Sequence, residues 1–243
     1  MINSIFIKFL TYLISFIDNP NKKKIIFFLK NKFKDKELRV IDIGAHKGET
    51  IDLFLENFKI KQIYSFEPNM SLFSKLKLKQ KYLNDRINLY NYGVGLKEKD
   101  EYLNIMTDTS SSTFNTLNTQ SEYFKKKKYI LSFFSGKKNL IDKREKVKII
   151  NLSKFLKKNK ISKIDILKID TEGFEFNILN GLINEDFKKI KFIYFEHHYD
   201  LMIDKGYKFS HINNLLINNN FEKKYKLKMK FRKSFEYIYE NSN

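Results

Sequence analysis

The sequence DIGAHKG (Asp42–Gly48) lies directly after the apolar run Leu38–Ile41 and directly before a helical pattern. This order predicts a strand that ends in a glycine turn, with a helix beginning right after the turn. An α/β sheet presents nucleotide-like ligands to the N-terminus of a helix in this way. Because glycine has no Cβ, Gly44 and Gly48 allow the backbone to pass close to such a ligand. The stretch therefore predicts an α/β fold with a ligand site at the end of its first strand.

The glycine spacing distinguishes between two kinds of cofactor. A dinucleotide loop reads G-x-G-x-x-G, so that a pyrophosphate can lie on bare backbone, whereas this loop reads G-x-x-x-G with bulky His46 between the glycines. The Asp42 carboxylate would repel a pyrophosphate but suits a ligand with an ammonium and a sulfonium, S-adenosylmethionine (SAM). Glu67 ends the next apolar run, where a carboxylate can accept hydrogen bonds from both ribose hydroxyls. The alternative is a strand–turn–helix without a ligand, in which both acids are ordinary turn residues.

Length and composition limit the class of protein. The 243 residues suffice for one domain of ordinary size, with or without an appendage, and the 42% of apolar residues can form a large core. The absence of cysteine excludes disulfides and thiolate metal sites and fits a cytoplasmic location. A net charge of +19 suggests nucleic acid as a partner, but the excess is spread along the chain. We therefore attribute the positive charge mainly to the overall amino-acid composition, and expect it to give the protein only a weak preference for anionic partners.

Residues 2–17 predict an amphipathic helix, because apolar residues recur at helical spacing opposite a polar stripe. The segment is too short, and too polar on one face, to span a membrane. No small-residue cleavage site follows, which argues against a secretory signal. With Lys22–Lys24 behind it, the helix could lie on an anionic membrane surface, but we favour docking on its own domain or on a partner. We accordingly divide the chain into an N-terminal helical segment, 1–37, and one domain, 38–243.

Strands and helices are expected to alternate along this domain, which predicts an open, mostly parallel sheet with helices on both faces. A helix is expected over Met70–Leu83, with Leu83 facing the core. The alternation breaks over residues 96–146, which predict an irregular insertion or lid whose lysine run, Lys125–Lys128, is a solvated surface. The expected strands are Leu38–Ile41, Ile63–Phe66, Ile87–Tyr90, Tyr102–Met106, Val147–Ile150, Ile164–Ile169 and Phe192–Phe195, with an antiparallel terminal hairpin of Phe221–Leu227 and Phe235–Tyr239.

A second group of chemistry-bearing residues follows two of the expected central strands. Asp170 follows Ile164–Ile169 in the sequence DTEGFE, and Glu196-His197-His198 follows Phe192–Phe195. Ligands bind at the carboxyl ends of parallel strands, so if these strands are neighbours, two carboxylates and two histidines converge. Lys168 shares a face with Asp170 on an apolar strand and is therefore expected to need a carboxylate partner.

Five segments of the sequence together are similar to the FkbM family of SAM-dependent methyltransferases. They are VIDIGAHKGET (Val40–Thr50), IYSFEPN (Ile63–Asn69), NYGVG (Asn91–Gly95), IDILKIDTEGFEFNILNG (Ile164–Gly181) and FEHH (Phe195–His198). The LKIDTEGFE block is the most specific, since it is long and not generic to Rossmann-like folds. The resemblance implies a class I methyltransferase fold with a seven-stranded, mostly parallel sheet. It also implies SAM as the methyl donor and, usually, O-methylation of a hydroxyl on a sugar, glycan or small metabolite.

The resemblance also implies roles for matching positions. The glycine loop Asp42–Gly48 and the acid Glu67 match cofactor contacts of the family, and NYGVG would border the adenine of SAM. The expected contacts are Asp42, Gly44, Ala45, His46, Gly48, Glu67, Asn91 and Tyr92.

Methyl transfer to oxygen is an in-line displacement, so alignment is the main task of the enzyme. An alcohol is still a poor nucleophile near neutral pH, which calls for a general base or a metal. We assign the base to His197 or His198, with Asp170 or Glu196 orienting it. A divalent metal held by these carboxylates and a histidine is a less favoured alternative.

Three other functions stay open at this point. The charge suggests a nucleic-acid methyltransferase, but no Asp/Asn-Pro-Pro-aromatic motif occurs and no RNA-binding module is evident. A non-catalytic or membrane-associated scaffold would keep the fold and use the N-terminal helix. An NAD-dependent oxidoreductase is disfavoured by the glycine spacing. We favour a small-molecule or glycan acceptor, whose pocket is expected under residues 107–140.

Overall fold

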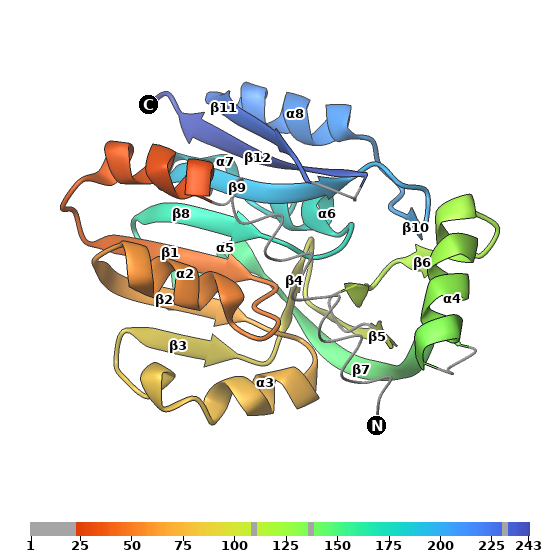
Figure 1. Cartoon of the computed structure of the whole chain (residues 1–243). Coiled ribbons are helices and arrows are strands. Elements are labelled where there is room, and N and C mark those ends of the chain that lie inside the picture. Colours follow the sequence, from red (N-terminus) through yellow and green to blue (C-terminus); the bar gives the residue numbers. More distant parts are fainter. Residues whose placement is uncertain (1–22, 108–110, 136–138, 230–232) are drawn as a thin grey trace.

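A seven-stranded sheet with the order β11-β12-β9-β8-β1-β2-β3 runs through the molecule (Figure 1). The computed structural model describes residues 23–107, 111–135, 139–229 and 233–243. Within this sheet β12 runs antiparallel to its neighbours β9 and β11, and the other strands are parallel. The strands are β1 (Leu38–Ile43), β2 (Ile60–Phe66), β3 (Ile87–Tyr90), β8 (Ile164–Ile169), β9 (Ile190–His198), β11 (Phe221–Lys228) and β12 (Ser234–Asn241). The predicted sheet and its terminal hairpin are confirmed. β11 is the edge strand, and β12 lies between β11 and β9.

Helices cover both faces of this sheet and bury it. Leu38 and Val40 of β1 pack with residues of the helix 23–33, α2 and α3, whereas Ile41 and Ile43 pack with α5, α6 and α8. Burial on both faces explains why the central strands read as nearly continuous apolar runs. The helices are α2 (Glu49–Asn57), α3 (Met70–Lys77), α4 (Glu122–Ser135), α5 (Leu152–Lys158), α6 (Glu175–Leu179), α7 (Asn184–Lys188) and α8 (Phe209–Asn218).

The segment 96–146 is more regular than expected, which corrects the prediction of an irregular insertion. β5 (Lys99–Met106) pairs antiparallel with β7 (Ile141–Asn151), and β4 (Gly93–Gly95) pairs parallel with β7 in a three-stranded sheet. Two short strands, β6 (Thr116–Leu117) and β10 (Ile203–Asp204), form another ladder near α4 (Figure 1). The first half of β7 is charged and exposed, so apolar alternation could not reveal it.

The second helix is shorter than the sequence suggested. α3 ends at Lys77, and Leu83 is 70% exposed instead of facing the core. A short 3-10 turn (Gln80–Tyr82) follows and places Tyr82 in the core, where its hydroxyl donates to the Gly48 carbonyl at 3.0 Å. The buried tyrosine therefore takes the position that the pattern assigned to Leu83.

The helix 23–33 is anchored on the sheet by Ile25, Leu29 and Phe33. The amphipathic helix predicted for residues 2–17 lies outside the described residues, and the division of the chain at residue 37 stays a prediction. Among the residues that the structure describes, no helix is long and apolar enough to cross a membrane.

The turn after β1 provides a test of local packing. Gly44 has a φ of 91°, and an added Cβ would lie 1.9 Å from the Asp170 carbonyl oxygen. We expect Gly44→Ala to lower the free energy of unfolding by at least about 2 kcal/mol, because a backbone clash adds to the left-handed strain. Chemical denaturation measures the change.

The matched control is Gly206→Ala, where φ is 68° but no heavy atom lies within 4 Å of the added Cβ. It adds the strain without the clash. An equal loss of stability in both variants would show that the close approach to Asp170 does not constrain residue 44.

Candidate functional site

The turn after β1 is tied to the end of β2. Gly44 N donates to the Phe66 carbonyl at 2.9 Å. His46 N donates to Glu67 Oε2 at 2.7 Å, and Asn69 N donates to Glu67 Oε1 at 2.8 Å. The Glu67 carboxylate thus holds two loops together. Because each carboxylate oxygen has more than one acceptor site, Glu67 can still accept hydroxyl donors from a ligand.

The same turn opens α2. Gly48 is its N-cap with a φ of 88°, and an added Cβ would lie 2.3 Å from the Tyr82 hydroxyl oxygen. His46 also has a positive φ of 50°, and its Nδ1 lies 3.1 Å from Glu49 Oε1. Ala45 is buried beneath the turn. The predicted loop residues therefore form a compact turn whose backbone N–H groups lie at a helix N-terminus, where polar ligand groups are stabilised.

Asp42 is the last residue but one of β1 and is 1% exposed. Ser65 Oγ donates to Oδ2 at 2.8 Å, and Oδ1 has no hydrogen-bond partner among the described residues. Burial raises the pKa of Asp42 to about 6, although the Ser65 hydrogen bond and the Lys168 ammonium lower it. A buried acceptor of this kind is suited to a cationic or hydrogen-bond-donating ligand group.

Asn91 and Tyr92 follow β3 beside the same loop. Asn91 Nδ2 donates to the Glu67 carbonyl at 2.8 Å and to the Pro68 carbonyl at 3.0 Å. The Tyr92 ring stacks on Tyr90, with 6.4 Å between ring centroids and 20° between planes. Asn91 therefore supports the Glu67 loop through its side chain, and Tyr92 extends an aromatic stack next to it.

A narrow cavity connects the end of β2 with the end of β8. Gly44, Glu67 and the turn Asp170–Glu172 line it, and Leu103 and Phe114 form part of its wall on the side of the three-stranded sheet. It encloses about 60 Å³. Ligand pockets commonly measure roughly 300 Å³ or more. The cavity is therefore smaller than the pockets that usually hold a ligand of nucleoside size.

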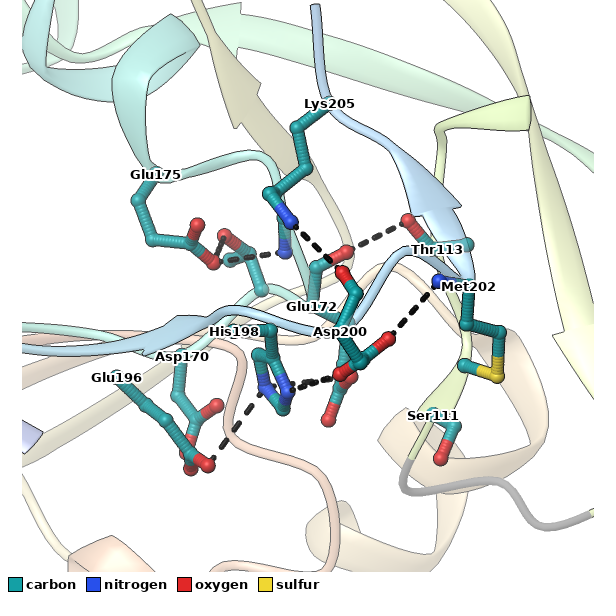
Figure 2. Close-up of polar contacts among 12 residues, drawn as sticks. Ser111, Thr113, Asp170, Glu172, Glu175, Glu196, His198, Asp200, Met202 and Lys205 are labelled. Atoms are coloured by element: carbon teal, nitrogen blue, oxygen red, sulfur yellow. Dashed lines mark hydrogen bonds and ion pairs between the residues drawn. The ribbon is translucent and has the colours of Figure 1, made fainter. Parts of the chain in front are cut away.

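The end of β8 carries an ion pair whose lysine is buried. Lys168 is 3% exposed, and its Nζ donates to Asp170 Oδ2 at 3.1 Å, which confirms that it has a carboxylate partner. Ile169 pairs with Phe195 of β9, so Asp170 and Glu196 follow on neighbouring strands. Figure 2 shows both carboxylates at the same edge of the sheet.

His198 lies among three carboxylates (Figure 2). Its Nε2 is 3.4 Å from Glu172 Oε2 and 3.6 Å from Glu196 Oε1, and its Nδ1 is 3.6 Å from Asp200 Oδ2. Burial disfavours the charged ring, but the carboxylates outweigh burial and raise the pKa of His198 to about 10. The ring is therefore an imidazolium at neutral pH and holds the acidic groups together.

Glu172 belongs to this cluster and to the lining of the narrow cavity. Burial raises the pKa of Glu172 to about 7, against the lowering effect of His198, and Glu196 raises it further. Its φ of 51° is left-handed, and Thr113 Oγ1 donates to its carbonyl at 2.8 Å. The sequence analysis did not name Glu172 as a site residue, although its position just after a strand end was a usable signal.

Asp200 was also missed by sequence reasoning. Its Oδ1 accepts the Met202 N–H at 3.0 Å, and His198 lowers its pKa against the effect of burial. No signal in the sequence pointed to it, because the expected strand stopped at Phe195 whereas β9 continues through His198.

His197 does not join the cluster. Neighbouring residues of β9 point to opposite faces, and the His197 ring packs among the aromatic side chains of Tyr199, Tyr207 and Phe209. Burial lowers the pKa of His197 to about 3, so the ring is neutral. Its Nδ1 is buried without a hydrogen-bond partner in the described part of the chain. The sequence predicted that both histidines converge with the two carboxylates. This prediction is wrong for His197, because successive side chains of a strand lie on opposite faces of the sheet.

A second, larger cavity borders both histidines. It measures about 910 Å³ and lies between the β6–β10 ladder and the start of α8, with Tyr199, Tyr207 and Phe209 in its wall. Its volume and aromatic lining are those of a pocket for an organic ligand. Within the described ranges, no group of three or more His, Asp or Glu residues is arranged to hold a metal ion.

Comparisons with known proteins agree with this architecture. A methyltransferase FkbM from Methylobacillus flagellatus KT superposes with a TM-score of 0.51 at 13% identity, covering 84% of this chain and 44% of that chain. This chain thus spans less than half of that protein. Magnesium protoporphyrin IX methyltransferase from Synechocystis PCC 6803, solved with bound SAH, gives a TM-score of 0.53 at 10% identity, covering 96% and 88%. At these identities the similarity shows the fold alone.

A search of curated proteins by sequence finds no match. The model of the methyltransferase FkbM domain, in contrast, matches residues 42–227, from the acid near the end of β1 almost to the end of β11. This match covers the glycine turn, the Glu67 loop and the carboxylate cluster in one continuous segment. The chain therefore belongs to the FkbM methyltransferase family.

Proposed function

We propose that this protein is a cytoplasmic SAM-dependent O-methyltransferase of the FkbM type that acts on a hydroxyl of a sugar, glycan or small metabolite. One observation carries the proposal. Gly44 and His46 of the glycine turn line the narrow cavity together with Glu67 and with Glu172, which belongs to the carboxylate cluster around His198. A donor site and a group of acid–base residues are the two parts that methyl transfer to oxygen needs.

The residues at the first two strand ends fit the donor. Gly44 permits the close approach that a side chain would block. Glu67 offers carboxylate oxygens for the ribose hydroxyls, and the free acceptor of Asp42 suits the ammonium of the methionine part. When bound, SAM supplies a methyl group on a sulfur that is already a good leaving group. The contribution of the protein is then to align the acceptor oxygen with that methyl group, which is worth roughly 7–11 kcal/mol.

The proton of the acceptor hydroxyl needs a base near the cluster. His198 is held as an imidazolium, so it cannot take a proton at neutral pH and instead orients the carboxylates around it. His197 is neutral but packs on the other face of β9. We therefore propose that a carboxylate, Asp170 or Glu196, accepts the proton, with His198 fixing the position of Glu196.

The larger cavity is the proposed binding site of the acceptor. His198 and Asp200 form part of its wall, so it adjoins the cluster. Its aromatic side chains provide flat apolar surfaces beside these charged groups. These groups suit a sugar ring or another small polyhydroxylated molecule.

The first test is donor binding by calorimetric titration. We expect SAM to bind the wild-type protein with a micromolar Kd, and Glu67→Ala to weaken binding at least about tenfold because charged hydrogen bonds to ribose are lost. Glu56→Ala, an exposed change on α2, is the matched control and should bind like the wild type. Thermal unfolding of each variant shows whether the Glu67 loop remains folded.

Two outcomes would redirect the assignment. Absence of SAM binding to the folded wild-type protein would overturn the methyltransferase proposal and favour a scaffold. Donor binding together with RNA binding that weakens steeply with salt would favour a nucleic-acid acceptor instead.

The opposite charge states of the two neighbouring histidines can be measured by NMR of the imidazole groups. Because the pKa of His198 is raised, its ring should stay protonated from about pH 6 to about pH 8, where an ordinary histidine loses its proton. Because the pKa of His197 is lowered, its ring should stay neutral down to about pH 5. His197→Gln and His198→Gln assign the signals. Ordinary titration of His198 near about pH 6.5 would contradict its role as the cation of the cluster.

A further inference from the structure

Glu172, Glu67 and Gly44 all line the narrow cavity. Glu67 comes from the end of β2, and Glu172 comes from the turn after β8. The Glu172 side chain is 12% exposed, so its carboxylate is largely shielded from water. The proposed ribose contact and a buried carboxylate therefore line one small space.

The chemistry of the donor places its charge in this space. In SAM the positively charged sulfur is bonded to C5′ of the ribose, one carbon away from the sugar ring. A ribose held by Glu67 thus brings the sulfonium into the same cavity. The product, S-adenosylhomocysteine (SAH), has the same skeleton with a neutral sulfur. A carboxylate beside the sulfur interacts differently with these two molecules, whereas contacts to ribose or to the amino acid part do not distinguish them.

The surroundings leave the Glu172 charge only partly compensated. Its ion-pair partner is His198, at 3.4 Å, whose imidazolium is shared with Glu196 and Asp200, and the Lys127 ammonium acts on Glu172 more weakly. Burial raises the pKa of Glu172 to about 7 in spite of these two cations, and Glu196 and Asp170 raise it further. An additional positive charge beside Glu172 would stabilise its ionised form. Such an interaction is strong where water is excluded.

We propose that Glu172 recognises the sulfonium charge of the methyl donor and makes the site prefer SAM over SAH. The inference rests on the proposed function, since it concerns the donor of that reaction. Methyl transfer removes the charge from the sulfur, so the attraction is present before transfer and absent after it. Glu172 thereby favours exchange of the product for a new donor molecule.

Calorimetric titration with three ligands tests this role without an acceptor. SAM and sinefungin carry a positive charge at or beside the sulfur position, and SAH does not. At about pH 8 we expect the wild type to bind SAM and sinefungin about tenfold more tightly than SAH. Glu172→Gln keeps the shape of the side chain without its charge, and should reduce this preference to about twofold or less with the SAH affinity unchanged.

The matched control is Glu185→Gln, which removes one negative charge from an exposed position on α7, before the start of β9. It should leave all three affinities unchanged. If Glu172→Gln does not fold, Glu172→Asp replaces it. This variant keeps the negative charge and should therefore still bind SAM more tightly than SAH. Equal affinities of Glu172→Asp for SAM and SAH would overturn the inference. Equal affinities of the wild type for SAM and SAH, or an unchanged preference in Glu172→Gln, would also overturn the inference and leave the proposed function intact. Failure of the wild type to bind any of the three ligands would overturn the proposed function itself.

Discussion

The contact between the turn after β1 and the end of β8 determines the arrangement of the site. Asp170 N donates to the Ile43 carbonyl at 2.9 Å, and the backbone of Gly44 approaches the Asp170 carbonyl so closely that a Cβ would lie 1.9 Å from it. Through this approach, the turn with Glu67 and the turn with Glu172 line one cavity. A larger residue at position 44 would separate the two strand ends, so a single missing Cβ keeps the proposed donor site next to the carboxylate cluster.

The electrostatics of the cluster follow from burying several acids around one cation. His198 has a pKa raised to about 10 because it faces carboxylates, whereas burial raises the pKa of Glu172 to about 7. His197, one residue away, has a pKa lowered to about 3 because burial and the nearby cations Lys205 and His198 outweigh the effect of Asp200. Two adjacent histidines thus differ in charge at neutral pH, since the alternation of a strand places them in different surroundings. A base formed by imidazole is therefore less suitable here than one formed by a carboxylate.

The sequence predicted the parts of the site that depend on local pattern. The strand Ile164–Ile169 was predicted with its observed bounds, and the need of Lys168 for a carboxylate follows from one charge on an apolar strand. The patterns were insufficient where tertiary contacts extend an element. β9 continues to His198 because it pairs with β12 from Phe192 through His198, so Glu196 and His198 share one face and His197 does not. The charged first half of β7 pairs with β5 and stays exposed, which no apolar periodicity records.

The narrow cavity and the cluster are also linked through the segment that follows β5. Phe114 contributes to the cavity wall and packs on Phe174, with 5.2 Å between ring centroids. On either side of it, Thr113 Oγ1 donates to the Glu172 carbonyl at 2.8 Å and Asn115 Nδ2 donates to the Gly173 carbonyl at 2.6 Å. This wall is therefore bonded to the turn that carries Glu172. A shift of the wall must either break these hydrogen bonds or move the turn, so the shape of the cavity is coupled to the position of Glu172.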